Sequence, residues 1–178
     1  MSERSDGIEM SLTSDGSENA DATKHLVFLL GDETYAVEVV RVEEVLEFPT
    51  IARVPRVPDY LLGVINLRGR VLPVMDLRSR MGLEAVEPTD DTRLIVINTR
   101  CGGEQISLTA LADSVIGVLD IENDVIEPAP RFESASDASD SIVLSGIARM
   151  PDRIVLLIDV DHLLTAEYLS KSYALLHT

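Results

Sequence analysis

The sequence predicts an all-β fold built from two similar small barrels, and three features support this prediction. Short apolar or alternating runs recur at close spacing from residue 25 onward, helical periodicity is confined to three stretches, and one strand-turn-strand pattern occurs twice. Many short strands separated by turn residues are typical of barrels and sandwiches, so these features together favour such a fold.

Nine runs have the length and composition of β-strands, because aliphatic and β-branched residues cluster or alternate between turn residues. The expected strands are 25–30, 34–39, 63–67, 70–75, 93–98, 104–110, 114–121, 142–150 and 153–158. Tight hairpin turns are expected at Gly31-Asp32, Arg68-Gly69, Cys101-Gly102-Gly103 and Pro151-Asp152. Pro73 interrupts a strong strand, which predicts a sheet edge or a bulge there, since proline cannot donate to a ladder.

Helical periodicity is weak and local. Short amphipathic turns are expected at 40–46 and 77–81, and a final helix at 160–176, where apolar residues recur every three or four positions. Residues 1–24 are acidic and polar, with too few apolar side chains to offset the entropy of ordering, so they predict a disordered tail. The Ser- and Asp-rich stretch 131–141 predicts an exposed loop.

An internal repeat indicates two similar halves within residues 25–178. The segment that opens with Gly63 and ends in Asp76 returns 83 residues later, opening with Gly146 and ending in Asp159. In both copies a glycine begins a strand, a tight turn follows, and an apolar strand ends in Asp before a helical turn. The alternative is that unrelated apolar hairpins resemble each other.

The charge and cysteine content exclude several classes of protein. The chain carries 31 acidic against 15 basic residues, a net charge of −16, which disfavours binding to nucleic acid. Its single cysteine, Cys101, cannot form an internal disulfide and suits a reducing cytosol. No signal peptide and no run of about 18 apolar residues is present, so we expect a cytoplasmic protein without membrane insertion.

Few residues suggest catalysis or cofactor binding. Asp76 and Asp159 could form an acid–base pair, but a position just before a helical turn favours an N-cap for each. Asp161 and His162 lie close to Asp159, yet no further histidine is near enough in sequence to complete a metal site. Phosphate-binding glycine loops are missing and Cys101 has no adjacent base, so we predict neither a cofactor nor an enzyme.

Several motifs resemble those of CheW-type chemotaxis coupling proteins. They are Phe28-x-Leu30-Gly31, Tyr35-Ala36-Val37, Val42-x-Glu44-Val45, Arg53-Val54-Pro55, Gly63-Val64-Ile65-Asn66-Leu67-Arg68-Gly69, Leu72-Pro73-Val74-Met75-Asp76-Leu77-Arg78, Thr92-Arg93-Leu94-Ile95-Val96, Asp113-Ser114-Val115, Val118-Leu119, Ile126-x-Pro128-x-Pro130 and Gly146-Ile147-Ala148. The resemblance covers about residues 25–165. One departure is the plain stretch Thr109-Ala110-Leu111-Ala112, where the family usually has glycine and β-branched residues.

The resemblance implies two intertwined five-stranded SH3-like barrels, with exchange of strands between the halves allowed. It also implies a non-catalytic adaptor that couples methyl-accepting chemotaxis receptors to the regulatory domain of the histidine kinase CheA in larger receptor arrays. The protein would then lie in the cytoplasm and reach the membrane only through its partners. Alternatives are coupling in a non-flagellar pathway, such as surface motility or gene control, or a small β-barrel enzyme.

Carried over position by position, the resemblance implies that receptor and kinase docking involves Val42, Glu44, Gly63, Arg68, Val115 and Val118. Arg68 stands at the tip of a predicted hairpin, from which a guanidinium can fork onto a carboxylate. Other interpretations are a solvated turn arginine or an internal pair with Glu44. Glu43, the neighbour of Glu44, is interpreted as a plain surface residue.

Overall fold

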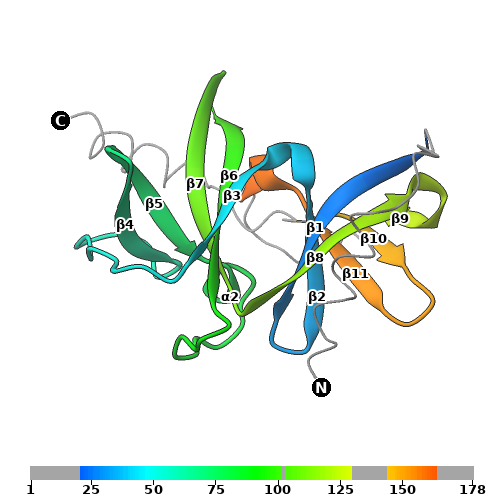
Figure 1. Ribbon diagram of the computed structural model, residues 1–178, viewed down its shortest axis with the longest axis horizontal. Helices are drawn as coiled ribbons and strands as arrows, with labels where there is room; N and C mark the ends of the chain where they lie inside the picture. The colour runs from blue at the N-terminus through cyan, green and yellow to red at the C-terminus, as the bar shows by residue number, and fades with distance from the viewer. Residues whose placement is uncertain (1–20, 102, 130–143, 164–178) are drawn as a thin grey trace, which may run out of the picture.

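The computed structural model describes residues 21–101, 103–129 and 144–163, and these confirm a nearly all-β fold (Figure 1). The strands are β1 (Ala22–Leu30), β2 (Glu33–Glu38), β3 (Val42–Glu47), β4 (Leu61–Leu67), β5 (Arg70–Asp76), β6 (Arg93–Cys101), β7 (Glu104–Ala112), β8 (Ser114–Glu122), β9 (Ile126–Pro128), β10 (Leu144–Arg149) and β11 (Ile154–Ile158). Helical turns are α2 (Leu77–Arg80), η2 (Val39–Arg41), η3 (Asn123–Val125) and η5 (Val160–His162).

The strands form two sheets that lie side by side as two barrels (Figure 1). The five-stranded barrel has the order β3-β6-β7-β5-β4, and the six-stranded barrel has the order β8-β1-β2-β11-β10-β9. The second barrel therefore has one strand more than predicted. That strand, β9, is three residues long, and its counterpart in the other barrel is a single bridge between Ala52 and Val64.

The barrels are intertwined because each contains a hairpin from the other half of the chain. The β1–β2 hairpin pairs with β8 and β11, while the β6–β7 hairpin pairs with β3 and β5. We call β1 to α2 the first half and β6 to η5 the second half. Neither half completes a barrel from its own strands.

The internal repeat predicted from the sequence corresponds to equivalent hairpins, β4–β5 and β10–β11. The register shifts between Leu61 and Gly63 in one, and between Leu144 and Gly146 in the other, which are the same positions 83 residues apart. A Cβ atom added to Gly63 would lie 2.1 Å from the Ala52 carbonyl oxygen, and one added to Gly146 would lie 3.0 Å from that of Glu127. Both glycines permit a close backbone approach.

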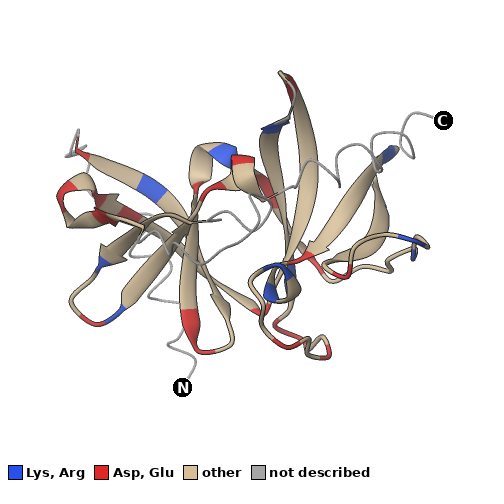
Figure 2. Cartoon of the chain, turned by 180° about the vertical axis from the view of Figure 1, so that it is seen from behind, with Lys and Arg blue, Asp and Glu red and all other residues tan. Residues whose placement is uncertain are grey.

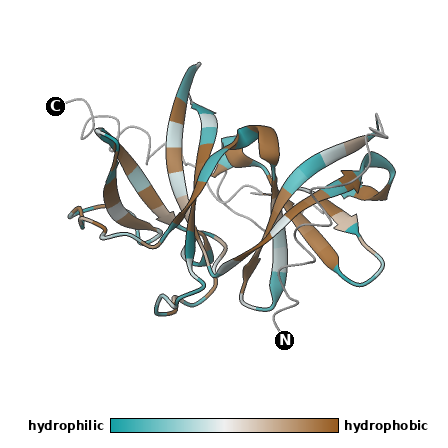
Figure 3. Ribbon diagram, viewed as in Figure 1, coloured by the Kyte–Doolittle hydropathy of each residue, from teal (hydrophilic) through white to brown (hydrophobic). Residues whose placement is uncertain are grey.

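Within the described residues, three apolar clusters hold the fold together, and the largest lies between the barrels rather than inside either. This central core draws on both sheets and includes Phe28, Tyr35, Ile95 and Leu108, among others. Smaller clusters fill the five-stranded barrel around Val74 and the six-stranded barrel around Val27. Figure 3 shows apolar residues along the strands of both barrels. The two barrels therefore share their largest apolar core.

The predicted helical turn at 40–46 is wrong for most of its length. Only Val39–Arg41 is helical, as η2, and Val42–Glu47 forms strand β3. The register of β3 shifts between Val42 and Glu44, so that Glu43 is the extra residue of a bulge. A seven-residue helix gains little on its own, whereas the strand gains a full ladder with β6.

Pro73 does not lie on an edge strand, because β5 has β4 on one side and β7 on the other. Its partner Val64 directs its backbone N–H and C=O to Ala52, so the nitrogen of Pro73 faces the β7 side. Pairing with β7 begins only at Val74, so the ladder requires no N–H at position 73. The bulge that we expected here is in β4 instead, opposite Val74.

Of the other predicted elements, some lie within the described residues and can be compared with the structure, and the rest lie outside them. The four predicted hairpin turns connect consecutive paired strands, and α2 confirms the turn expected at 77–81. Strand β1 begins at Ala22, inside the predicted tail, whereas residues 1–20 lie outside the described residues. So do the predicted loop at 131–141 and the predicted C-terminal helix beyond Leu163, of which η5 is the described beginning.

Candidate functional site

The turn between β4 and β5 presents Arg68 to solvent. Arg68 and Gly69 have φ angles of 53° and 86°, as a two-residue type I′ hairpin turn requires. Asn66 supports the turn, because its Oδ1 accepts a hydrogen bond from the Gly69 N–H at 2.9 Å. The Arg68 side chain is 75% exposed. The sequence therefore places a long cation at a geometrically defined tip.

Arg68 forms a two-pronged ion pair with Glu44. Its Nη1 and Nη2 atoms donate to Glu44 Oε1 and Oε2 at 2.7 and 3.1 Å. Glu44 belongs to strand β3 rather than to a helix, and it is less exposed than Arg68. The internal pair considered from the sequence is thus present. With described residues, the guanidinium uses two of its five N–H donors in this pair, which leaves donors that a partner carboxylate can accept from.

A second ion pair lies beside the first and was not anticipated. Arg70 Nη2 donates to Glu43 Oε2 at 2.7 Å, and the Ser107 hydroxyl donates to Glu43 Oε1 at 2.8 Å. The Arg70 hydrogen bond is the main cause that holds the pKa of Glu43 below its ordinary value. Sequence analysis missed Glu43 because its position depends on the β-bulge in β3, and alternation of apolar and polar residues does not reveal a bulge.

These two ion pairs connect elements that backbone pairing leaves apart. Strands β3 and β4 are the two edges of the five-stranded sheet. Glu43 and Glu44 come from β3, whereas Arg68 and Arg70 come from the end of the β4–β5 hairpin. The side chains therefore bridge the edges of this barrel and place a cluster of two arginines and two carboxylates on its surface.

The three valines of the predicted site lie on edge strands of both barrels. Val42 is on β3, an edge of the five-stranded sheet, while Val115 and Val118 are on β8, an edge of the six-stranded sheet. All three are partly buried against the central core. The bulge at Glu43 directs Val42 toward the central core and Glu44 toward the other face, since their partners are the adjacent residues Ile97 and Val96.

Gly63 is placed differently from the other predicted site residues. It is buried in β4, and the Ala52 carbonyl occupies the space that a side chain would need. Its φ of 153° also disfavours any L side chain. Gly63 therefore shapes the strand that carries Arg68. The structure brings Glu44 and Arg68 into contact. The three valines are not part of this pair and pack against the central core instead.

The suggested acid–base pair has a structural role at both positions, as expected for N-caps. Asp76 Oδ1 accepts from the Arg78 N–H at 3.0 Å, and Asp159 Oδ1 accepts from the Asp161 N–H at 3.1 Å. Burial raises the pKa of Asp76, against the opposing effect of backbone hydrogen bonds from Arg78 and Ser79. A cavity of about 510 Å³ is lined by Asp76 but not by Asp159.

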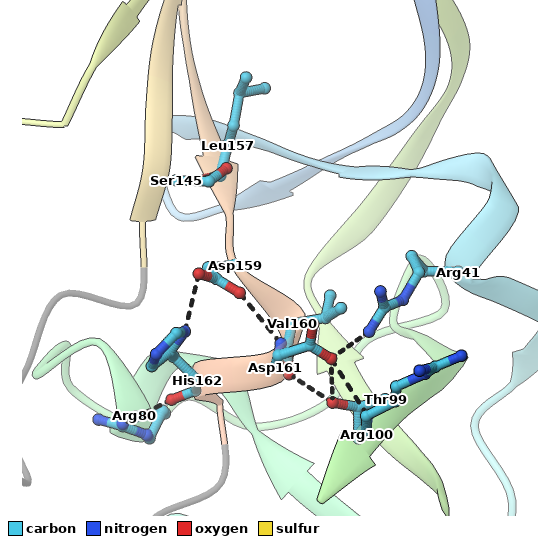
Figure 4. A network of polar contacts seen from close by, with 10 residues as sticks. All are labelled: Arg41, Arg80, Thr99, Arg100, Ser145, Leu157, Asp159, Val160, Asp161 and His162. Carbon is cyan, nitrogen blue, oxygen red and sulfur yellow. Dashed lines mark hydrogen bonds and ion pairs between the residues drawn. The ribbon is translucent and has the colours of Figure 1, made fainter. Parts of the chain in front are cut away.

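The suggested metal ligands also have other partners. Asp159 Oδ2 contacts the His162 ring at 2.7 Å, while Asp161 turns away to Arg41, Thr99 and Arg100 (Figure 4). Across the part of the chain that the structure describes, no group of three or more His, Cys, Asp or Glu side chains is placed to hold a metal ion. The helices among these residues are all too short or too polar to cross a membrane.

Two barrels that exchange hairpins, with the charged and apolar residues of the site on their edge strands, define a double-barrel scaffold. The chain belongs to the family of CheW-like domains, whose sequence model matches residues 24–168. This match covers both barrels and extends over most of the chain. The resemblance found in the sequence is therefore confirmed.

Individual relatives agree with this assignment. The chain is 35% identical to the chemotaxis protein CheW of Bacillus subtilis over 145 residues, covering 81% of this chain and 88% of that protein. It is 32% identical to CheW of Klebsiella aerogenes over 142 residues, covering 80% and 81% of the two chains. The crystal structure of the scaffolding protein TtCheW from Thermoanaerobacter tengcongensis superposes with a TM-score of 0.72 at 29% identity, covering 83% of this chain and 95% of that one. The protein is thus a chemotaxis scaffold, or adaptor.

Proposed function

We propose that this scaffold is a non-catalytic cytoplasmic adaptor that couples methyl-accepting chemotaxis receptors to the regulatory domain of the histidine kinase CheA. The observation that carries this proposal is the Arg68–Glu44 pair, in which Arg68 lies on an exposed turn of a CheW-like barrel and Glu44 on the neighbouring strand β3. Family membership supports receptors and kinase as the partners, and the surface chemistry of the barrels supports where they bind.

The first docking surface that we propose contains Arg68 and Glu44. A partner carboxylate can approach the exposed face of the guanidinium while Glu44 holds the side chain in place, which lowers the entropy lost on binding. Such charge-assisted hydrogen bonds confer orientation and selectivity. Gly63 contributes by holding β4 close to Ala52, so that the β4–β5 turn keeps its position.

The second docking surface that we propose contains Val42, Val115 and Val118. These side chains lie at the boundary between the central core and the surface, on strands that each leave one edge unpaired in the sheet. Partly buried valines offer apolar area with little side-chain entropy to lose. An unpaired edge can also accept a strand or barrel of a partner.

Several weak contacts of this kind would suffice to build a receptor array. Once one contact forms, the next becomes effectively intramolecular, and the gain can reach roughly 100-fold without any stronger single interface. The adaptor would reach the membrane through the receptors, so we place it in the cytoplasm at membrane-associated arrays. Larger assemblies then follow from repeated use of the same two surfaces.

The test is a binding measurement with the purified CheA regulatory domain and a receptor cytoplasmic fragment. We expect Arg68→Ala to weaken binding to at least one of them by roughly tenfold or more, as for a buried arginine contact of about 1.4 kcal/mol. The melting temperature should hardly change. The matched control is Arg153→Ala, which removes an exposed arginine from the equivalent β10–β11 hairpin.

Three results would contradict the proposal. Binding of the unmodified protein to neither partner would exclude the function itself. Equal weakening by Arg68→Ala and Arg153→Ala would exclude a specific role of Arg68. Loss of binding together with loss of stability would make the role of Arg68 structural.

A further inference from the structure

Because the two barrels have the same strand pairings, each residue near their contact has an equivalent residue in the other barrel, which the strand register identifies. Val74 pairs with Thr109 in one barrel as Leu157 pairs with Ala36 in the other. Thr109 in turn pairs with Val96, and Ala36 pairs with Val27. Gly31 and Arg100 each lie four residues beyond these valines. They are therefore equivalent positions near the ends of these hairpins: Gly31 lies in the β1–β2 turn, and Arg100 lies in β6, where it pairs with Gln105.

The first contact of interest, which we call the first clasp, is the ion pair between Arg78 and Asp113. Arg78 Nη1 and Asp113 Oδ2 are 2.5 Å apart, and the side chains are only 15% and 28% exposed. The Gly31 N–H donates to the same oxygen at 2.6 Å. The Asp113 N–H donates to the Leu29 carbonyl at 3.0 Å. The clasp thus joins α2, the β1–β2 hairpin and the connection after β7.

The second clasp is the ion pair between Arg41 and Asp161 (Figure 4). Asp161 Oδ1 also accepts from the Arg100 N–H at 3.1 Å and from the Thr99 hydroxyl at 2.9 Å. This clasp joins η5, the β6–β7 hairpin and the turn η2 after β2. Both clasps therefore connect the same three kinds of element, once in each half of the repeat.

The two clasps are equivalent in position but reversed in charge. Arg78 and Asp161 are 83 residues apart, and each lies two residues after a capping Asp. Their partners, Asp113 and Arg41, follow the equivalent strands β7 and β2. In both clasps the aspartate accepts the backbone N–H of the equivalent hairpin residue. The arginine lies on the helical turn in the first clasp and on the connection in the second, and the aspartate lies on the opposite element in each.

This reversal gives each half a single sign of charge at the clasps. The first half contributes Arg41 and Arg78, and the second half contributes Asp113 and Asp161. Each clasp therefore joins opposite charges from different halves. If a first half instead assembled with another first half, Arg78 would meet Arg41. If a second half assembled with another second half, Asp161 would meet Asp113.

We propose that the clasps are specificity determinants that make the halves of this chain recognise each other and reject pairing of like halves. Backbone register cannot supply this selectivity, because the strand pairings of the two barrels are equivalent. Like charges in close, partly desolvated contact oppose wrong pairings more strongly than they would in water. The chain has few cations for such use, and Figure 2 shows acidic segments on both barrels. A chain with this selectivity joins first halves only to second halves, so it does not form dimers in which like halves pair.

The first test uses charge reversals in the full chain. Arg78→Asp and Asp113→Arg each place like charges together, so each alone should lower the melting temperature by about 3 °C or more. The double variant R78D/D113R should recover most of this loss. The second clasp already has this arrangement: Asp161, at the position equivalent to Arg78, accepts from the Arg100 N–H and pairs with Arg41.

The decisive test is the assembly state after refolding. In R78D/D113R each half carries one arginine and one aspartate, so like halves can pair with matched charges. We expect refolding from urea at high protein concentration to yield several-fold more dimer than the unmodified chain, as measured by size-exclusion chromatography with light scattering. The fourfold variant R41D/R78D/D113R/D161R again gives the halves opposite signs and should return to monomer.

The control is the exposed pair Lys24–Asp120, which also joins the two halves. The equivalent register pair in the other barrel is Arg93 with Glu47, in which the acidic residue is in the first half and the basic residue in the second. In the unmodified chain, Lys24 of one first half would therefore meet Glu47 of another, so like halves already match charges at this position. K24D/D120K should therefore refold as a monomer. If R78D/D113R folds poorly, the reciprocal swap R41D/D161R makes the same prediction. A dimer fraction in the swapped variants equal to that of the unmodified chain, or single reversals without loss of stability, would overturn the proposal.

Discussion

The β4–β5 and β10–β11 hairpins are two versions of the same structure with different surfaces. Both have a bulge next to a buried glycine, Gly63 or Gly146, and both end in an aspartate that caps a helical turn. They differ at the turn, which is Asn66-Leu67-Arg68-Gly69 in one and Arg149-Met150-Pro151-Asp152 in the other. They also differ two residues after the cap, where Arg78 corresponds to Asp161.

This comparison separates what both barrels need from what each uses alone. The glycine leaves room for a backbone carbonyl of the neighbouring segment, and the aspartate accepts an N–H at the start of the helical turn. Both barrels need these two features. The turn and the clasp residue contact side chains or solvent, so they can differ between the barrels. Substitutions at equivalent positions can test this separation, in order of expected effect.

The largest effect is expected from Gly63→Ala. Its Cβ would lie 2.1 Å from the Ala52 carbonyl oxygen at an unfavourable φ, so we expect a loss of about 3 kcal/mol in the free energy of unfolding. Gly146→Ala is the matched variant. Its nearest contacts are 2.9 and 3.0 Å, which predicts a loss of about 1 kcal/mol. Urea unfolding measures both, and an equal loss or a reversed order would show that these Cβ distances do not determine the cost.

The caps should come next. Asp76→Ala removes a buried cap of α2 and should cost about 1–2 kcal/mol, whereas Asp159→Ala removes a more exposed cap of a single 3-10 turn and should cost about 0.5 kcal/mol. Thermal unfolding of the two variants measures the difference. Unchanged stability of Asp76→Ala would indicate that the cost of burying its carboxylate cancels the benefit of its hydrogen bonds.

Asp161→Asn should have a pH-dependent effect. Burial by itself raises the pKa of Asp161, but the hydrogen bonds from Arg100, Thr99 and Arg41 outweigh it and lower the pKa. A carboxyl with a lowered folded-state pKa stabilises the fold above its unfolded pKa of about 3.9, and this contribution is lost as the pH falls through the folded pKa. We expect a loss of about 1 kcal/mol at pH 7 that vanishes in strong acid.

The control for this pH dependence is Asp76→Asn. Because burial raises the pKa of Asp76, the unmodified chain should lose stability relative to this variant as the pH rises through the folded-state pKa. The two variants should therefore differ in the sign of their pH slopes. Urea unfolding over a pH series measures the slopes, and equal signs would contradict the assigned environments.

The smallest effect on stability is expected at the two turns. Arg68→Ala should change the free energy of unfolding by less than about 1 kcal/mol, because its ion pair with Glu44 is solvent-exposed. Arg153→Ala should change it even less, since the ion pair of the Arg153 side chain is with the neighbouring, exposed Asp152 at 3.4 Å. Chemical unfolding checks both values. A larger loss at Arg68 would mean that its pair closes the barrel rather than leaving a surface for partners.

Most of the secondary structure followed from local sequence signals. Alternation and turn residues predicted the hairpins, and the repeat predicted that Asp76 and Asp159 would both be caps. Strand β3 was mistaken for a helical turn because the bulge at Glu43 gives Val42 and Val45 a spacing that also suits a helix. The site was predicted in part: Glu44 and Arg68 meet, whereas Glu43, Arg70 and Ser107 were not expected beside them.

The sequence alone determined the class of fold, the repeat and the family, because these depend on patterns within short segments. Only the tertiary structure decided which hairpins are exchanged between the halves and that the largest core lies between the barrels. It also decided the clasps, whose partners are 35 and 120 residues apart. Such contacts depend on how strands assemble rather than on local propensity, and no pattern within one segment specifies a partner in another.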